Sequence, residues 1–291
     1  MNNKFSPQRR HDAKKDPSLG AGNVKNQYKK QTQKQWNRNP CGILGIDENI
    51  PYGSLEFFEA VKQKRYESES WIKEKIDFTS ARGKKVLEIG YGMGTDLRTF
   101  RENGAKVYGV DITPEHNRLA RLNFKLHRET AELKLCDAAN LPFPSGTFDI
   151  VYSNGVLHHT PDTVRCLSEA YRVLKPGGRL ILALYRKNSA YHWIQMLLVN
   201  GILKGQLRKL GYAGLLSTIE YGADGIKVKP LVKLYGGKQL KIILSDFSQV
   251  ETKVTFFKRE HLSKFGWFLP RFMEKVLEPW FGWYVVAYAV K

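Results

Sequence analysis

The sequence of 291 residues is poor in cysteine and has no long uninterrupted apolar run. Its three cysteines, Cys41, Cys136 and Cys166, form no Cys-x-x-Cys pair and no metal-ligand spacing, which argues against a disulfide framework or a cysteine-bound metal. The longest apolar stretches, near 191–203 and 280–290, are too short to span a bilayer, and the first residues lack the apolar core of a signal peptide. These features predict a cytoplasmic protein without a metal site.

Acidic residues are scarce: 28 Asp and Glu stand against 47 Lys and Arg, and the formal net charge is +19. Residues 1–40 hold ten basic and two acidic residues, and residues 187–291 hold sixteen and seven, whereas residues 41–186 are nearly balanced with 21 and 19. Such an excess attracts nucleic acid, anionic lipid or an acidic substrate, although it also occurs on ordinary solvated surfaces. The central part of the chain therefore differs in character from its two ends.

Residues 1–39 are almost free of aliphatic side chains and rich in Asn, Gln, Lys and Arg. Such a segment cannot bury enough apolar area to offset its chain entropy, so we expect a basic disordered tail that is either solubilising or in contact with RNA. Residues 40–83 differ, because apolar side chains recur at helical spacing from about 55 to 77. One or two amphipathic helices are predicted there, as an N-terminal cap.

The most informative stretch runs from Lys84 to Asp111, with the sequence KKVLEIGYGMGTDLRTFRENGAKVYGVD. A short apolar strand enters three glycines at alternate positions, a helical segment follows, and a second apolar strand ends at Asp111. Glycine lets the backbone approach a ligand, the helix N-terminus offers free N–H groups, and a carboxylate at the strand end can accept both ribose hydroxyl protons. The unit predicts a nucleotide-type site. A dinucleotide such as NAD is one alternative, although a dinucleotide motif has its third glycine three residues after the second, where this chain has Thr95; a tight turn without a ligand is the other.

Further apolar strands are expected at 132–136, 148–152 and 179–185, separated by helical segments. Strands that alternate with helices at this spacing predict a parallel, doubly wound sheet. Two alternating stretches, 250–257 and 282–290, are expected to complete it as the sixth and seventh strands, the last one antiparallel. The core of this sheet is expected within residues 84–186.

Four separated segments together resemble the class I S-adenosylmethionine (SAM) methyltransferases, in the group that contains the ubiquinone and menaquinone methyltransferases. They are Glu88-x-Gly90-x-Gly92-x-Gly94, the acid Asp111, Asp137-Ala138 before a Leu-Pro-Phe run, and the segment FDIVYSNGVLHHTPD followed by RVLKPGG. The resemblance is close over 84–186 and loose over 36–83. It implies an α/β, Rossmann-like fold: a mostly parallel, doubly wound seven-stranded sheet with an antiparallel last strand and helical inserts.

The resemblance also implies SAM as the cofactor and assigns its parts to residues. Asp111 would bind the ribose hydroxyls, Ile112 would pack on the adenine, and Asp137 would accept a hydrogen bond from the adenine amine. The glycine-rich turn and the end of the fourth strand would line the methionine part. The implied cofactor-binding residues are Glu88, Gly90, Tyr91, Gly92, Gly94, Asp111, Ile112, Asp137, Ala138, Ser153 and Asn154.

His158 and His159 follow the fourth strand and are the candidate catalytic residues. A neutral imidazole near the transferring methyl group can take a proton from an acceptor hydroxyl or amine. The alternative is that one histidine caps the next helix and the other packs in the core. No Asn-Pro-Pro-Tyr or Asp-Pro-Pro-Tyr motif follows the strand, which disfavours methylation of the exocyclic amines of nucleobases.

Residues 187–291 contain two aromatic inserts, about 187–236 and 258–281, around the last strands. In class I methyltransferases such inserts build the acceptor pocket or a lid, and apolar walls favour a hydrophobic acceptor. The alternatives are that the inserts form a second small core or rest on an anionic membrane. We therefore predict methyl transfer from SAM to an O, N or C atom of an apolar or amphipathic small molecule. An RNA methyltransferase and a non-enzymatic SAM-binding regulator stay open.

Overall fold

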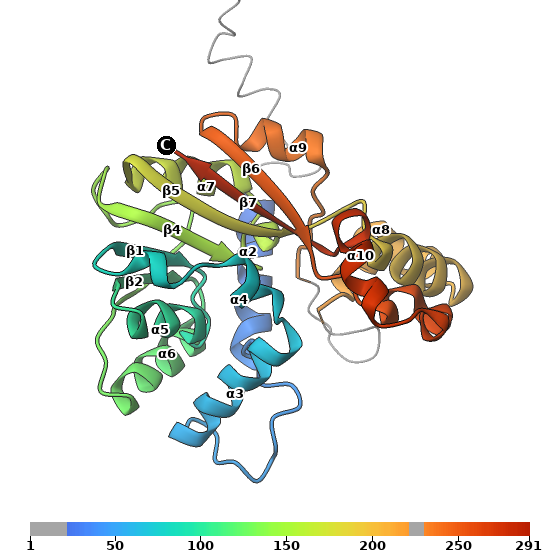
Figure 1. The fold of residues 1–291 in the computed structure, drawn as a ribbon, viewed down its shortest axis with the longest axis horizontal. Coiled ribbons are helices and arrows are strands. Elements are labelled where there is room, and N and C mark those ends of the chain that lie inside the picture. Colours follow the sequence, from blue (N-terminus) through green and yellow to red (C-terminus); the bar gives the residue numbers. More distant parts are fainter. Residues whose placement is uncertain (1–21, 221–229) are drawn as a thin grey trace, which may run out of the picture.

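The structure, a computed structural model, describes residues 22–220 and 230–291. A central sheet of seven strands is flanked by helices on both faces (Figure 1). The strands are β1 (Lys85–Ile89), β2 (Lys106–Asp111), β3 (Glu132–Leu135), β4 (Phe148–Asn154), β5 (Leu174–Tyr185), β6 (Ser248–Thr255) and β7 (Tyr284–Val290). The helices that flank them include α3 (Leu55–Ser68), α4 (Trp71–Lys75), α5 (Thr95–Glu102), α6 (Pro114–Leu126), α7 (Thr163–Val173) and α9 (Gly237–Ile243).

The strand order is β3-β2-β1-β4-β5-β7-β6. Neighbours from β3 to β5 pair in parallel, whereas β7 is antiparallel to both β5 and β6. The predicted fold class, including the antiparallel last strand, is therefore confirmed. Because the order reverses between β1 and β4, the carboxyl ends of these two strands border a crevice suited to a ligand.

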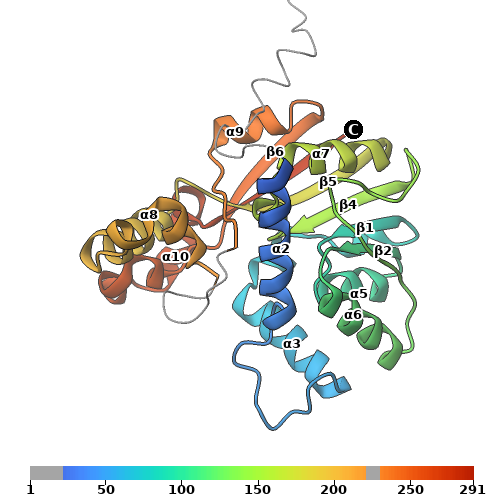
Figure 2. The same ribbon diagram turned by 180° about the vertical axis from the view of Figure 1, so that it is seen from behind.

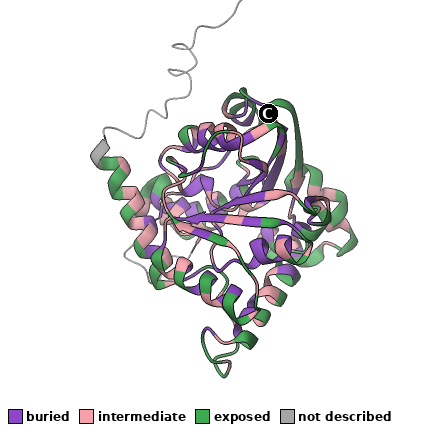
Figure 3. Cartoon of the chain, turned by 90° about the vertical axis from the view of Figure 1, so that its left-hand side faces the viewer, coloured by how far each residue is buried: buried purple, intermediate pink, exposed green. Residues whose placement is uncertain are grey.

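Alternate side chains of the strands form two separate apolar layers, one on each face of the sheet. On one face Val86 and Ile150 join Phe100 of α5, and on the other Leu87 and Val151 join Leu167 of α7. Figure 3 shows the strands largely buried between helices whose outer surfaces are exposed. This double burial explains why the strands read as nearly continuous apolar runs in the sequence.

The N-terminal segment differs from expectation, because residues 22–38 form a helix, α2 (Gly22–Arg38). It packs on α6 and crosses the carboxyl ends of the central strands (Figure 2). Polar contacts hold it: Lys25 pairs with Asp162 at 2.7 Å, and Gln33 Nε2 donates to the Ile112 carbonyl at 2.9 Å. The prediction of disorder for residues 1–39 is therefore wrong from residue 22 onward, since it counted only apolar burial; residues 1–21 lie outside the described part.

The predicted helical cap is present as α3 and α4. Ser54 caps α3, its Oγ accepting from the backbone N–H of Phe57 at 3.1 Å, and Phe58, Trp71 and Ile72 are buried. The amphipathic spacing thus predicted helices whose apolar side faces the domain.

The two C-terminal inserts pack together into what we call the helical lobe. It consists of the π-helix η3 (Tyr191–Leu203), α8 (Gln206–Ser217), the 3₁₀ segment η4 (Arg259–Phe268) and α10 (Phe272–Phe281). Contacts join η3 to both α8 and η4, and α10 to β6. Figure 1 shows the lobe projecting beyond one end of the sheet, so the inserts form a body beside the domain.

Candidate cofactor site

A cavity of about 360 Å³ lies at the carboxyl ends of β1, β2 and β4. Nine of the eleven predicted cofactor residues line it: Glu88, Gly90, Tyr91, Gly92, Asp111, Ile112, Asp137, Ala138 and Asn154. Residues that are far apart in the sequence therefore meet where the strand order reverses, as open α/β sheets require of a ligand site.

The other two predicted residues, Gly94 and Ser153, do not line the cavity. Ser153 is fully buried, and its hydroxyl donates to the Ile89 carbonyl at 3.0 Å, which ties β4 to β1. Gly94 precedes α5, and a Cβ built there would lie 3.1 Å from the ring of Phe124. Both residues support the elements around the turn from outside the cavity lining, and their direct role in cofactor binding stays a prediction.

Gly90 is the position of the turn that most requires glycine. Its φ is +80°, and a Cβ atom built on it would lie 2.3 Å from the Val156 side chain. Any larger residue would force apart the turn after β1 and the loop after β4, both of which line the cavity.

Asp111 is held in place at both of its carboxylate oxygens. Oδ2 accepts from the Gly92 amide at 3.0 Å, and Oδ1 accepts from the Thr113 amide at 2.8 Å. His116 Nδ1 lies 3.2 Å from Oδ2; burial opposes charge on this ring, yet the Asp111 carboxylate raises the pKa of His116 to about 10. A carboxylate has roughly four lone-pair sites, so Asp111 keeps capacity for a ribose hydroxyl.

Two further acids, Glu88 and Asp96, lie at the β1 side of the cavity and differ in their hydrogen-bond partners and in the direction of their pKa shifts. Glu88 is buried, its Oε2 has no partner, and burial, with Asp96 next, raises the pKa of Glu88 well above its usual range. Asp96 is equally buried but accepts from Arg65 Nε and Nη2 at 2.8 and 2.7 Å. Burial raises the pKa of Asp96, but Arg65 and the tyrosine hydroxyls that donate to Asp96 outweigh it and leave the pKa lowered. A buried polar atom normally has a hydrogen-bond partner, and a cationic group of a bound ligand would supply one to Glu88 Oε2.

Helix α2 closes the side of the cavity where the adenine is predicted. Lys29 pairs with Asp137, and Gln33 donates to the Ile112 carbonyl at 2.9 Å. Trp36 lies between His116 and His159, with ring centroids 6.4 and 5.9 Å away. This wall is not predicted from the sequence, because α2 has few apolar residues; the aromatic and basic side chains of 28–38 are its only signal.

The two candidate catalytic histidines occupy different places. His158 is fully buried, does not line the cavity and stacks on Tyr185 at 3.8 Å; burial lowers the pKa of His158 well below its usual range. His159 does line the cavity, and its Nδ1 lies 2.7 Å from the Leu231 carbonyl, which it can reach only as a donor. Its Nε2 lies 3.4 Å from Glu220. Of the two, His159 has the position from which a substrate proton could be reached.

Within residues 22–220 and 230–291, one group of side chains has ligand atoms close enough to hold a metal: His158, His159 and Glu220, within 4.8 Å of one another. Glu220 already accepts from the Tyr185 hydroxyl at 2.9 Å, besides facing His159. These contacts account for the position of Glu220, and the prediction that the site works without a metal stays a prediction.

The rest of the cavity wall comes from the N-terminal part of the chain. Apolar and polar side chains of residues 36–69 contribute, among them Trp36, Leu44, Val61, Arg65 and Glu69. No described residue beyond Pro161 lines the cavity, although Leu231 of the first insert accepts from His159, which does line it. That the C-terminal inserts build the acceptor pocket or a lid stays a prediction, and the described wall comes from α2 and the N-terminal cap.

Comparisons with known proteins agree with this geometry. Residues 87–182, about a third of the chain, match a family described as a methyltransferase domain. The chain is 34% identical over 109 residues to phosphoethanolamine N-methyltransferase 2 of Caenorhabditis elegans, covering 36% of this chain and 24% of that protein. It is 37% identical over 100 residues to demethylmenaquinone methyltransferase of Tropheryma whipplei, covering 34% of this chain and 41% of the relative.

Among solved structures, a SAM dependent methyltransferase from Archaeoglobus fulgidus superposes with a TM-score of 0.51 at 19% identity, covering 80% of this chain and 94% of the other. This likeness concerns the fold. The chain spans less than half the length of the curated relatives above, and the similarity is confined to the domain around the cavity. The predicted resemblance to SAM-dependent methyltransferases is confirmed, and it supports the predicted enzyme class and cofactor.

Proposed function

We propose that this chain is a SAM-dependent methyltransferase that acts on an apolar or amphipathic small molecule. The observation that carries the proposal is the convergence of nine predicted cofactor residues on one cavity at the reversal of strand order. The methyltransferase domain match covers the glycine turn, both strand-end acids and the histidine pair. The relatives named above are enzymes on different acceptors, so the acceptor must be inferred from this chain's own walls.

When bound, SAM supplies a methyl group already activated by its sulfonium, so the protein's task is to align the acceptor and exclude water. Glu88 and the backbone of the glycine turn would hold the methionine part, and Asp111 the ribose. Asp137 and Ile112 would hold the adenine, beneath α2. His159 would take a proton from acceptors that must lose one.

The acceptor side favours a small molecule over RNA. Trp36, Leu44 and Val61 provide apolar wall. The α2 lysines nearest the cavity are neutralised, Lys29 by Asp137 and Lys25 by Asp162, whereas a phosphate track needs cations free to bind phosphate. RNA remains the second candidate because the ends of the chain are basic.

The test is methyl transfer from labelled SAM into fractionated cell extract, scored separately for small molecules, lipid, RNA and protein. We expect label in the small-molecule or lipid fraction, unchanged by ribonuclease and strongly reduced, at a low SAM concentration, when Asp111→Asn replaces the wild type. Label that appears in RNA and disappears on ribonuclease digestion would contradict the acceptor proposal. SAM binding without transfer to any fraction would instead favour a non-enzymatic regulator.

A further inference from the structure

The helical lobe gathers most of the exposed apolar side chains of the described chain. Of twenty large hydrophobic residues that are exposed, twelve lie on its four elements: Trp193, Leu198, Ile202, Leu203, Tyr212, Phe265, Trp267, Phe268, Phe272, Val276, Trp280 and Phe281. Isolated exposed hydrophobic residues are ordinary, but a concentration on one body marks an interaction surface.

One short segment forms the centre of this surface; we call residues 264–272 the aromatic tip. Phe265, Trp267, Phe268 and Phe272 are 75%, 76%, 88% and 69% exposed, which places all four among the five most exposed large hydrophobic residues of the described chain. Because they fall within eight consecutive residues, the backbone itself keeps them together.

The exposure is not that of a loose loop, because the surroundings of the tip are fixed. Gly266 is buried, and a Cβ built there would lie 1.8 Å from the Arg259 carbonyl oxygen. Glu274 accepts from the Arg259 amide at 3.1 Å, and Glu278 accepts from the Phe256 amide at 3.0 Å. A structured platform therefore presents the aromatic rings to solvent.

The charge around the tip has one dominant sign. The four elements of the lobe and the residues that border them, Lys204, Lys258 and Arg271, contain eight Lys and Arg against three Asp and Glu. Two of the three acids, Glu274 and Glu278, are engaged by backbone amides, whereas Lys264 and Arg271 flank the aromatic residues and are exposed. Protein surfaces that lie in the headgroup region of anionic membranes combine aromatic side chains with neighbouring basic side chains in this way.

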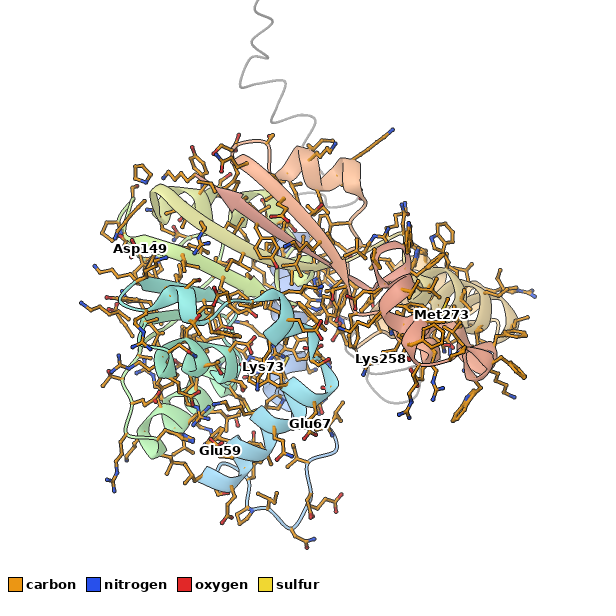
Figure 4. The ribbon with its side chains drawn as sticks, viewed as in Figure 1. Glu59, Glu67, Lys73, Asp149, Lys258 and Met273 are labelled. Carbon is orange, nitrogen blue, oxygen red and sulfur yellow. The ribbon has the colours of Figure 1, made fainter. Side chains whose placement is uncertain are left out.

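The position of the lobe fits such contact. The lobe is connected to the carboxyl ends of β5 and β6 and to the beginning of β7. All three lie at the same end of the sheet as the cavity, which is bordered by the carboxyl ends of the parallel strands. In Figure 4 the side chains of the lobe, near the labelled Met273, point outward, away from Asp149 at the other end of the sheet. No helix of the described residues is long and apolar enough to cross a membrane, so a contact would be made from one side.

We propose that the helical lobe is a docking surface for an anionic lipid membrane, with the aromatic tip at the boundary between headgroups and acyl chains. The basic residues bind the headgroups, and the rings enter the interface. This surface is separate from the cofactor cavity, so the proposal holds or fails independently of methyl transfer.

The experiment is sedimentation of the full chain with vesicles of phosphatidylcholine, with and without phosphatidylglycerol. We expect binding to the anionic vesicles, reduced roughly tenfold or more by the double variant Trp267→Ala/Phe268→Ala. The double variant Lys264→Ala/Arg271→Ala should lose about fivefold per charge on anionic vesicles only. The matched control, Lys241→Ala/Ile242→Ala on α9, replaces an exposed basic and an exposed apolar residue outside the lobe and should bind like the wild type.

Several results would overturn the proposal. The wild type could fail to sediment with anionic vesicles, or the tip variants could bind as well as the α9 control. Light scattering could show a dimer that depends on the tip, without vesicle binding, and the occupant would then be a second copy of the chain. Thermal melting of each variant verifies that it is folded before it is compared.

Discussion

Replacing Asp111 by asparagine is expected to weaken SAM binding by about 10- to 100-fold, the loss of one or two hydrogen bonds to a charged acceptor. Asp111 carries the charge that attracts two backbone amides and His116, and it is the predicted partner of the ribose hydroxyls. The asparagine side chain keeps the shape and one acceptor oxygen but loses the charge. Titration calorimetry of the wild type and the variant measures the change.

A matched control separates this effect from general damage to the sheet. Asp149 also accepts from a backbone amide, that of Lys85 at 2.8 Å, and pairs with Lys175, yet it does not line the cavity. Asp149→Asn should therefore bind SAM like the wild type. An unchanged dissociation constant in a folded Asp111→Asn variant would rule out the ribose role.

Replacing Asp96 by asparagine is expected to lower the free energy of unfolding by about 3 kcal/mol, as in other buried ion pairs that lose one partner. Arg65 and the hydroxyls of Tyr66 and Tyr152 all donate to this carboxylate, so it ties α3, α5 and β4 together. The variant presents an amide N–H₂ to Arg65 and leaves this partly exposed guanidinium with only Glu69, 3.5 Å away, as an acidic partner. Urea unfolding without SAM at pH 7 measures the loss.

The pH dependence of this difference has a definite sign. The pKa of Asp96 is lowered in the folded state, so its stabilisation is complete above the ordinary carboxyl pKa, about 3.9. It is lost as the pH falls through the lowered value, and the variant and wild type should then converge. Glu102→Gln, on the same helix but half-exposed, should cost less than about 1 kcal/mol, and an equal cost for both variants would contradict the buried network.

The sheet and most of the cofactor side of the cavity could be predicted from the sequence, because each depends on local patterns. Apolar runs specify strands, and the glycine turn and strand-end acid Asp111 occupy fixed places relative to them. Asp137 and Asn154 are assigned through the family resemblance, and their positions agree with the rule that parallel strands bring their carboxyl ends to one edge. Gly94 and Ser153 belong to the same motifs, but which side of the backbone they face depends on packing against Phe124 and Ile89.

The part of the wall formed by α2 could not be predicted, because its contacts are polar and distant in sequence. Helix α2 has no apolar stripe, and it is held by pairs such as Lys25–Asp162, which join residues 137 positions apart. The same limit applies to the histidines: although they are adjacent in sequence, His158 stacks on Tyr185 outside the cavity lining, whereas His159 lines the cavity and contacts the Leu231 carbonyl. The acceptor pocket was therefore expected from the aromatic inserts, while the described wall comes from the N-terminal segments.

Calorimetric titration of the full chain with S-adenosylhomocysteine, run in parallel with NAD, tests the central claim most directly. Glu88 and Asp137 suit the methionine and adenine parts of SAM and of its product. A dinucleotide motif would have a third glycine three residues after Gly92, and this chain has Thr95 there. If the cavity is a SAM site, the chain binds S-adenosylhomocysteine one-to-one and shows no measurable binding of NAD. Tight binding of NAD with none of S-adenosylhomocysteine would contradict it.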